Sequence, residues 1–71
     1  MINPTDADIG RPIAYYGIWA EGGVIFGEFR GPVALGYEFQ CGVNFGEWQA
    51  RKGYRPDQVL NLRTEDLDWA D

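Results

Sequence analysis

Apolar and polar residues alternate along positions 33–45, which read VALGYEFQCGVNF. A period of two is the pattern of an extended strand with one buried face. The buried set is expected to be Val33, Leu35, Tyr37, Phe39, Cys41 and Val43, and Phe45 continues the alternation. The exposed set is expected to be Glu38, Gln40 and Asn44.

This alternating stretch is too long to remain straight in so small a chain. Fully extended it would span roughly 40 Å at about 3.3 Å per residue, whereas a chain of this length has a radius of gyration of only about 11 Å. Gly36 and Gly42 lie at its polar positions, and glycine inside a strand marks a bulge or a bend. We expect the main break at Cys41–Gly42, which leaves strands over residues 33–40 and 43–50.

The rest of the chain predicts short elements separated by turns. Further strands are expected over residues 13–18, 24–30 and 59–62, with a glycine-rich turn at 20–23 and a tight turn or bulge at 30–32. Near the end, Thr64 precedes two acidic residues, which favours one helical turn over 64–69. Leu67 and Trp69 would then face the sheet.

These elements predict an all-β fold of one domain covering residues 1–71, with a polar N-terminal segment at 1–8 and an insertion loop at 46–58. A small, five-stranded antiparallel barrel of the SH3-like type, with one short C-terminal helical turn, is the most economical closure because it leaves few exposed edges. The alternative is an open sheet whose second apolar face is covered in a homodimer. Ile18, Ile25 and Phe29 would then need that cover.

Composition narrows the classes of function. Aromatic residues make up 15% of the 71 residues, and the net charge is −5 with no histidine. The negative charge argues against sequence-independent nucleic-acid binding and against acidic membranes. The single cysteine, Cys41, falls on the apolar set of the strand, so we expect an inert thiol in a reducing compartment. Without a long apolar run, a cytoplasmic location is expected.

Residues for catalysis are not assembled in any pattern that we recognise. General acid–base chemistry near neutral pH usually uses histidine, which the chain lacks. Cys41 has no evident partner base, and the acidic residues do not follow the spacing of a metal-binding loop. We therefore predict a protein that is not an enzyme and that uses no cofactor or metal.

The two ends of the chain together resemble a known group. The segment DIGRPIAYY (8–16) resembles the opening, and RTEDLDW (63–69) the ending, of very small SH3-like barrel proteins encoded by tailed phages and prophages. The two segments cover 16 of the 71 residues, and the middle of the chain differs. The resemblance implies a phage or prophage origin, a bacterial host cell and an SH3-like barrel. It transfers no activity, because members of the group are mostly uncharacterised.

Two surfaces compete as the contact site. The first is the inserted segment, where basic residues are interleaved with aromatic ones that are typical of binding hot spots: Trp48, Arg51, Lys52, Tyr54 and Arg55. The second is an acidic face that forms if the first strand lies beside the final turn: Asp6, Asp8, Glu65, Asp66, Asp68 and Asp71. Trp19, beside the glycine-rich turn, is a further aromatic residue in a loop.

The leading hypothesis is a non-catalytic interaction module or inhibitor that acts on a host or phage protein, with interference in bacterial defence as one such role. A structural or assembly protein of the virion is the alternative. Nucleic-acid binding through the basic 51–55 loop, which can hold phosphate and stack a base, is the weaker alternative. The chain would act as a monomer or a homodimer.

Overall fold

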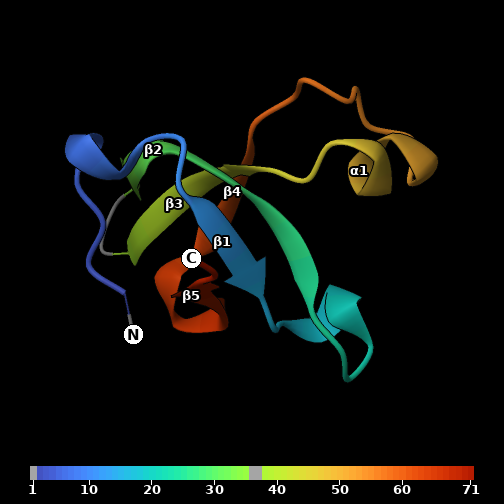
Figure 1. Cartoon of the computed structure of the whole chain (residues 1–71), viewed down its shortest axis with the longest axis horizontal. Coiled ribbons are helices and arrows are strands. Elements are labelled where there is room, and N and C mark those ends of the chain that lie inside the picture. The colour runs from blue at the N-terminus through green and yellow to red at the C-terminus, as the bar shows by residue number, and fades with distance from the viewer. Residues whose placement is uncertain (1, 36–37) are drawn as a thin grey trace.

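Five antiparallel strands form one sheet in the order β4-β3-β2-β1-β5 (Figure 1). The computed structural model describes residues 2–35 and 38–71, and the side chains of residues 32–39 lie outside that description. The strands are β1 (Pro12–Tyr15), β2 (Ile25–Leu35), β3 (Glu38–Asn44), β4 (Leu60–Arg63) and β5 (Leu67–Trp69). The helical elements are the 3-10 turns η1 (Asp6–Asp8), η2 (Ile18–Ala20) and η3 (Thr64–Asp66) and the helix α1 (Glu47–Arg51). The predicted all-β class is confirmed, and β4 and β5 are the two edges of the sheet.

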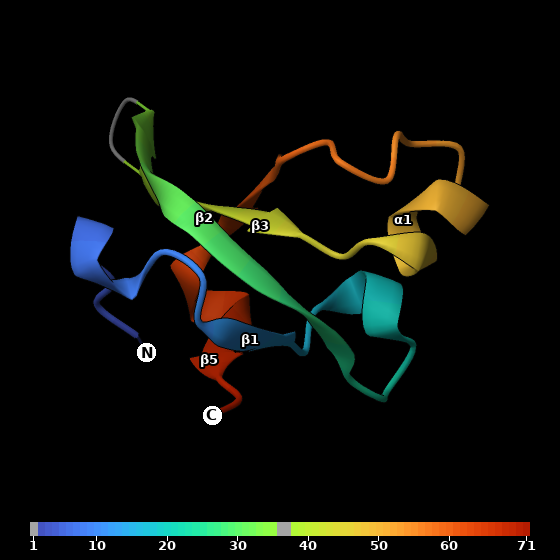
Figure 2. The same ribbon diagram turned by 45° about the horizontal axis from the view of Figure 1, so that its top comes forward.

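The long strand β2 is shared by the two halves of the sheet (Figure 2). Residues 25–28 pair with β1, and residues 28–35 pair with β3. The register shifts between Phe29 and Gly31, and Gly31 has φ of +138°, a conformation that side chains rarely adopt. The predicted turn or bulge at 30–32 is thus a bulge, and a bulge bends the strand that carries it.

The predicted break at Cys41–Gly42 is wrong. Leu35 pairs with Glu38, so the chain reverses between them, and β3 then runs without interruption to Asn44. Gly42 serves close packing instead of a bend: a Cβ there would lie 2.8 Å from Cγ1 of Val59. The stretch predicted as one strand at 33–40 therefore belongs to two strands.

The buried half of the alternation is confirmed where the structure describes the side chains. Cys41, Val43 and Phe45 are buried. Gln40 and Asn44 are half-buried, not exposed as predicted, because Gln40 lies opposite Arg63 in the register and the Asn44 side chain hydrogen-bonds to the 46–58 segment. The other predictions lie outside the described side chains: Val33, Leu35, Tyr37, Phe39 and Glu38.

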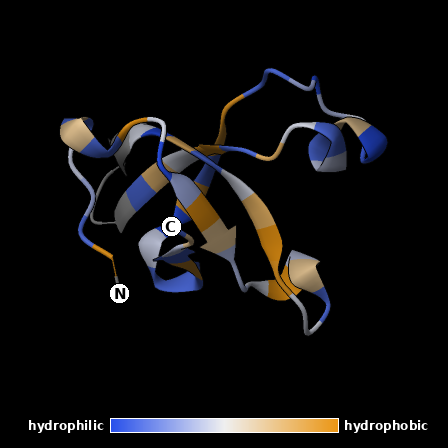
Figure 3. Cartoon of the chain, viewed as in Figure 1, coloured by the Kyte–Doolittle hydropathy of each residue, from blue (hydrophilic) through white to orange (hydrophobic). Residues whose placement is uncertain are grey.

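The core lies on one side of this bent sheet and includes a residue from before the first strand. Its members are Ile2, Ile13, Tyr15, Ile25, Phe29, Cys41, Val43, Phe45, Leu60, Leu62 and Leu67. Ile25 and Phe29 are buried within the single chain and so do not need the cover that the alternative of a dimeric open sheet gave them, whereas Ile18 is 87% exposed. Apolar residues gather on β1 and the first half of β2 (Figure 3), and Phe26 is exposed there.

Four other predicted elements have different boundaries in the structure, among them the strand at 24–30, which begins at Ile25 and continues to Leu35 as β2. The expected strand at 13–18 ends at Tyr15, and the 3-10 turn η2 follows. The expected strand at 59–62 is confirmed as β4 (Leu60–Arg63). The expected helical turn at 64–69 ends at Asp66, because Leu67–Trp69 pair with β1 as the edge strand β5.

Candidate functional site

The segment between β3 and β4 is built around one buried amide. The strand predicted at 43–50 ends at Asn44, residues 47–50 belong to α1 instead, and Gln49 of this helix is fully buried. The Gln49 Oε1 accepts a hydrogen bond from the Phe45 N–H at 2.8 Å. Its Nε2 donates to the carbonyls of Arg55 and Gln58 at 2.6 and 2.7 Å. A glutamine with both ends satisfied thus orders a loop that has little apolar core of its own.

Asn44, the last residue of β3, fastens the other end of the segment. Its Nδ2 donates to the carbonyls of Pro56 and Gln58 at 2.8 and 2.9 Å, and its Oδ1 accepts from the Gly46 N–H at 3.1 Å. The two amide side chains hold α1 in a defined place on the side of the molecule away from the N-terminal segment (Figures 1 and 2). In residues 44–50, Glu47 and Gln49 fall on positions that the strand alternation would make apolar. This interruption could have indicated the helix.

Four aromatic rings connect α1 to η2 and to the core. Tyr15 packs edge-on against Phe45 at 5.9 Å between ring centroids, and Phe45 against Trp48 at 5.5 Å. Trp48 stacks on Trp19 at 6.4 Å, and Trp19 returns to Tyr15 at 5.9 Å. The rings form a closed circuit, so the two outer tryptophans rest on a buried aromatic base.

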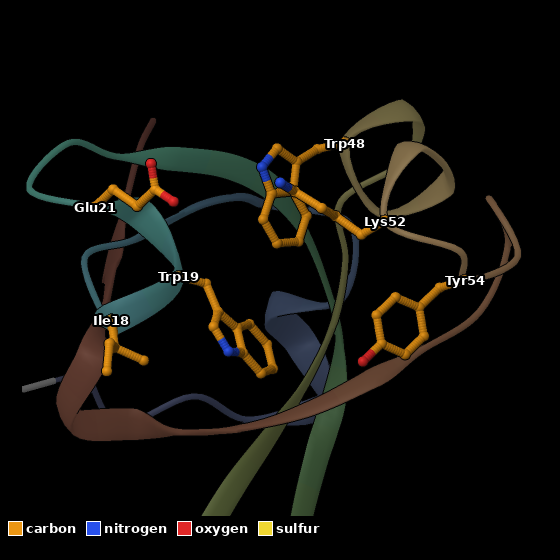
Figure 4. A pocket seen from close by; sticks show the side chains of 6 residues that line it. All are labelled: Ile18, Trp19, Glu21, Trp48, Lys52 and Tyr54. Atoms are coloured by element: carbon orange, nitrogen blue, oxygen red, sulfur yellow. The ribbon is translucent and has the colours of Figure 1, made fainter.

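A groove of about 340 Å³ opens between η2 and α1. Its lining residues are Ile18, Trp19, Glu21, Trp48, Lys52 and Tyr54 (Figure 4). Trp19 is 47% and Tyr54 42% exposed. The Lys52 Nζ lies 5.8 Å from the ring centroid of Trp48. The groove therefore presents aromatic walls to solvent, with a carboxylate on the η2 side and an ammonium on the α1 side.

The groove contains part of the predicted basic and aromatic site. Trp48, Lys52 and Tyr54 line it, whereas Arg51 and Arg55 are exposed and are not among its lining residues. The sequence pointed to Trp19 as a loop aromatic but did not join it to this site. Ile18 and Glu21 had not been predicted as site residues at all. The sequence feature that could have indicated this part of the site is the apolar pair Ile18-Trp19, directly before a glycine-rich turn. Large apolar residues next to such a turn are easily left exposed.

The competing acidic face carries cations of its own. Arg11 hydrogen-bonds Asp8 at 2.8 Å through one nitrogen, and both oxygens of Asp71 at 2.8 and 2.9 Å through two others. Arg63 lies 3.5 Å from Glu65. The remaining predicted members sit in η1, η3 and β5: Asp6, Asp66 and Asp68. The structure thus joins Asp8 to Asp71 through a guanidinium that partly neutralises the face.

These contacts shift the protonation of the terminal carboxyls. The backbone N–H of Thr5, followed by the Arg11 guanidinium, holds the pKa of Asp8 below its usual value. Arg11 likewise lowers the pKa of Asp71, chiefly through their hydrogen bonds, and the pKa of Arg11 is raised in return. Elsewhere, burial alone raises the pKa of the Cys41 thiol to about 11, which keeps it protonated and unreactive at neutral pH.

No group of three or more metal-ligating side chains occurs within residues 2–35 and 38–71. None of the helices in that part of the chain has the length and apolar character needed to cross a bilayer. No protein-family model, curated protein or solved structure matches this chain. The resemblance of its terminal segments to the phage group therefore stays a prediction.

Proposed function

We propose that this chain is a non-catalytic protein-interaction module and that the groove between η2 and α1 is its contact site. The observation that carries the proposal is the half-exposed Trp19, stacked on Trp48 at the mouth of the groove. Tryptophan and tyrosine dominate binding hot spots because they bury large rigid areas at low entropic cost. A rigid aromatic wall prepared before binding keeps that cost low.

The finer fold assignment is part of the same proposal. We infer an SH3-like arrangement, supported by β1 pairing with both β2 and β5. The bend in β2 and the 3-10 turn between β4 and β5 add to this support. The phage or prophage origin, and a role as an inhibitor of a host protein in the bacterial cytoplasm, rest on the resemblance of the terminal segments.

An affinity capture from infected or lysogenic bacterial cells tests the proposal. Wild type is compared with Trp19→Ala and with Phe26→Ala, which removes an exposed aromatic side chain that does not line the groove. We expect Trp19→Ala to reduce the captured partner at least tenfold, since hot-spot truncations cost about 2 kcal/mol or more. Phe26→Ala should retain it.

The opposite result for the two variants would show that the contact site lies elsewhere on the chain. Retention by Trp19→Ala with loss on Phe26→Ala would place the contact on the outer face of β1 and β2 and overturn the groove. Sedimentation of the chain with virus particles would instead favour the virion alternative. Thermal unfolding of each variant provides the control for folding.

A further inference from the structure

The basic residues of this acidic chain divide into two classes. The sequence holds six Lys and Arg residues against eleven Asp and Glu. Four of the six contact carboxylates: Arg11, Arg30, Arg55 and Arg63. No ion pair within the described part of the chain includes Arg51 or Lys52. In a protein with such an excess of acids, two adjacent cations without a carboxylate are an unusual feature.

Both of these cations lie at the end of α1 beside the groove. Lys52 lines the groove and its ammonium faces the Trp48 ring, while Arg51, the preceding residue, is exposed and is not a lining residue. Arg55, which follows in the same segment, is only loosely engaged, at 3.8 Å from Asp57. The single acid in the lining, Glu21, stands on the η2 side (Figure 4). The charges of the lining are therefore divided, with the Lys52 ammonium on the α1 side and the Glu21 carboxylate on the η2 side.

This local charge acts over the range that matters for binding. Salt screens charges beyond about 8 Å at physiological ionic strength, so a group bound in the groove senses the charges of the lining, such as Lys52, more strongly than charges farther away. A carboxylate placed there meets two cations with which no carboxylate in the described part of the chain forms an ion pair. An apolar side chain placed between Trp19 and Tyr54 gains aromatic contact.

We propose that the groove binds a short acidic segment of a protein, in which an apolar or aromatic side chain enters between the rings and neighbouring Asp or Glu carboxylates meet Arg51 and Lys52. This inference rests on the proposed function and specifies the partner that the groove recognises. Complementary charge would also set the orientation of the bound segment, because carboxylates on the opposite side would meet Glu21.

A nucleic-acid strand is the competing occupant, and the charges disfavour it. A strand brings one phosphate per nucleotide along its whole length, and binding requires many cations to neutralise them. The site offers two unpaired cations in a chain of net charge −5, and Glu21 faces the same space. A segment that combines one apolar anchor with a few carboxylates matches this arrangement better.

Tryptophan fluorescence of the full chain, titrated with designed peptides, tests the proposal. The probes are blocked six-residue peptides with one central phenylalanine flanked by two aspartates, two serines or two lysines, and a six-nucleotide single-stranded DNA. We expect the aspartate peptide to bind at least tenfold more tightly than the lysine peptide, and its affinity to fall as salt is raised. The serine peptide should lie between them.

Two double variants assign the charge preference to its residues. Arg51→Gln with Lys52→Gln should abolish the difference between the aspartate and lysine peptides. Arg30→Gln with Arg63→Gln removes the same net charge from β2 and β4, away from the end of α1, and should preserve it. Trp19→Ala should weaken all three peptides, because it removes the aromatic wall.

Three results would overturn the inference: equal binding of the three peptides, no binding of any of them at millimolar concentration, or tighter binding of the DNA. A different result separates it from the proposed function. If the partner captured from cells depends on Trp19 but not on Arg51 and Lys52, the groove remains the contact site and the acidic segment is wrong. If the partner does not depend on Trp19, the proposed function itself fails.

Discussion

The chain uses a cation beside a tryptophan in two places, and the two places differ in whether the surrounding charges are satisfied. At the chain ends, Arg11 lies 3.9 Å from the Trp69 ring centroid and also binds Asp8 and Asp71. At the groove, Lys52 lies 5.8 Å from the Trp48 ring centroid, and no carboxylate in the described part of the chain pairs with it. At the first site, which we call the terminal clasp, the cation is paired with carboxylates of the same chain. At the groove, the cation remains available to a partner.

The difference shows that a tryptophan and a neighbouring cation can stabilise the fold in one place and be available to bind a partner in another. In the terminal clasp, Trp69 packs edge-on against buried Phe29 at 5.6 Å on one side and under Arg11 on the other. Its contacts are within the chain. In the groove, Trp19 has one stacked partner and much of its surface in solvent. Rings and charges whose contacts lie within the chain contribute to folding. Rings and charges that remain exposed can contribute to binding.

The largest expected effect is on the terminal clasp. Trp69→Ala removes the ring that joins β5 to Phe29 and should lower the free energy of unfolding by about 3 kcal/mol, as large aromatic truncations do. In so small a domain that is a large part of the total. Urea unfolding measures it, and Trp19→Ala, which truncates a half-exposed ring, should lower the free energy much less. Equal losses in the two variants would contradict the distinction between clasp and groove.

Gln49→Met should destabilise the segment that carries the groove without destabilising the sheet. The substitution keeps the volume but leaves the Phe45 N–H and the carbonyls of Arg55 and Gln58 without their buried partner, at a cost of about 2–3 kcal/mol. We expect α1 and residues 52–58 to lose amide protection in hydrogen exchange while β1 and β2 keep it. Loss of protection throughout the sheet would show that the segment is not a separate unit. Gln58→Met, which removes only an exposed hydrogen bond from the Arg55 N–H at 3.3 Å, is the matched control.

Acid should weaken the terminal clasp through Asp8 and Asp71. Their pKa values are lowered in the folded state, so their contribution is present above the unfolded pKa near 3.9 and is lost as pH falls through the folded values. Asp71→Asn should therefore reduce the fall in melting temperature between pH 5 and pH 2. The effect should be modest because both carboxyls face solvent. An unchanged acid dependence in Asp71→Asn would show that the ion pair does not contribute.

The smallest expected effect concerns Cys41, a buried residue of β3 whose accessibility measures how often the sheet opens. Because burial raises its pKa to about 11, its reaction with a thiol reagent at pH 8 should be slow and limited by opening of the sheet. Trp69→Ala should accelerate labelling strongly, and Tyr54→Ala should leave its rate unchanged. Fast labelling of the wild type would contradict the buried position.

Local pattern was sufficient for the class of fold and for part of the site. Alternation correctly placed Cys41, Val43 and Phe45 inside, since a period of two depends only on neighbouring residues. It could not locate the reversal of the chain, because Gly36 and Gly42 carry the same local signal and only packing against Val59 explains the second. The strand predicted at 43–50 ends at Asn44 for a similar reason: the Gln49 side chain accepts a hydrogen bond from residue 45 and donates to residues 55 and 58, and these bonds form only in the folded chain.

The sequence by itself determined the all-β class, the acidic net charge and the collection of aromatic and basic residues at 48–55. Only the tertiary structure decided which charges are paired, because Arg11 meets Asp71 across 60 positions. It also brought Trp19 to Trp48, from segments that lie on different sides of β2 and β3 in the sequence. Pairing between distant residues depends on how strands are ordered in the sheet, and neither composition nor periodicity specifies that order.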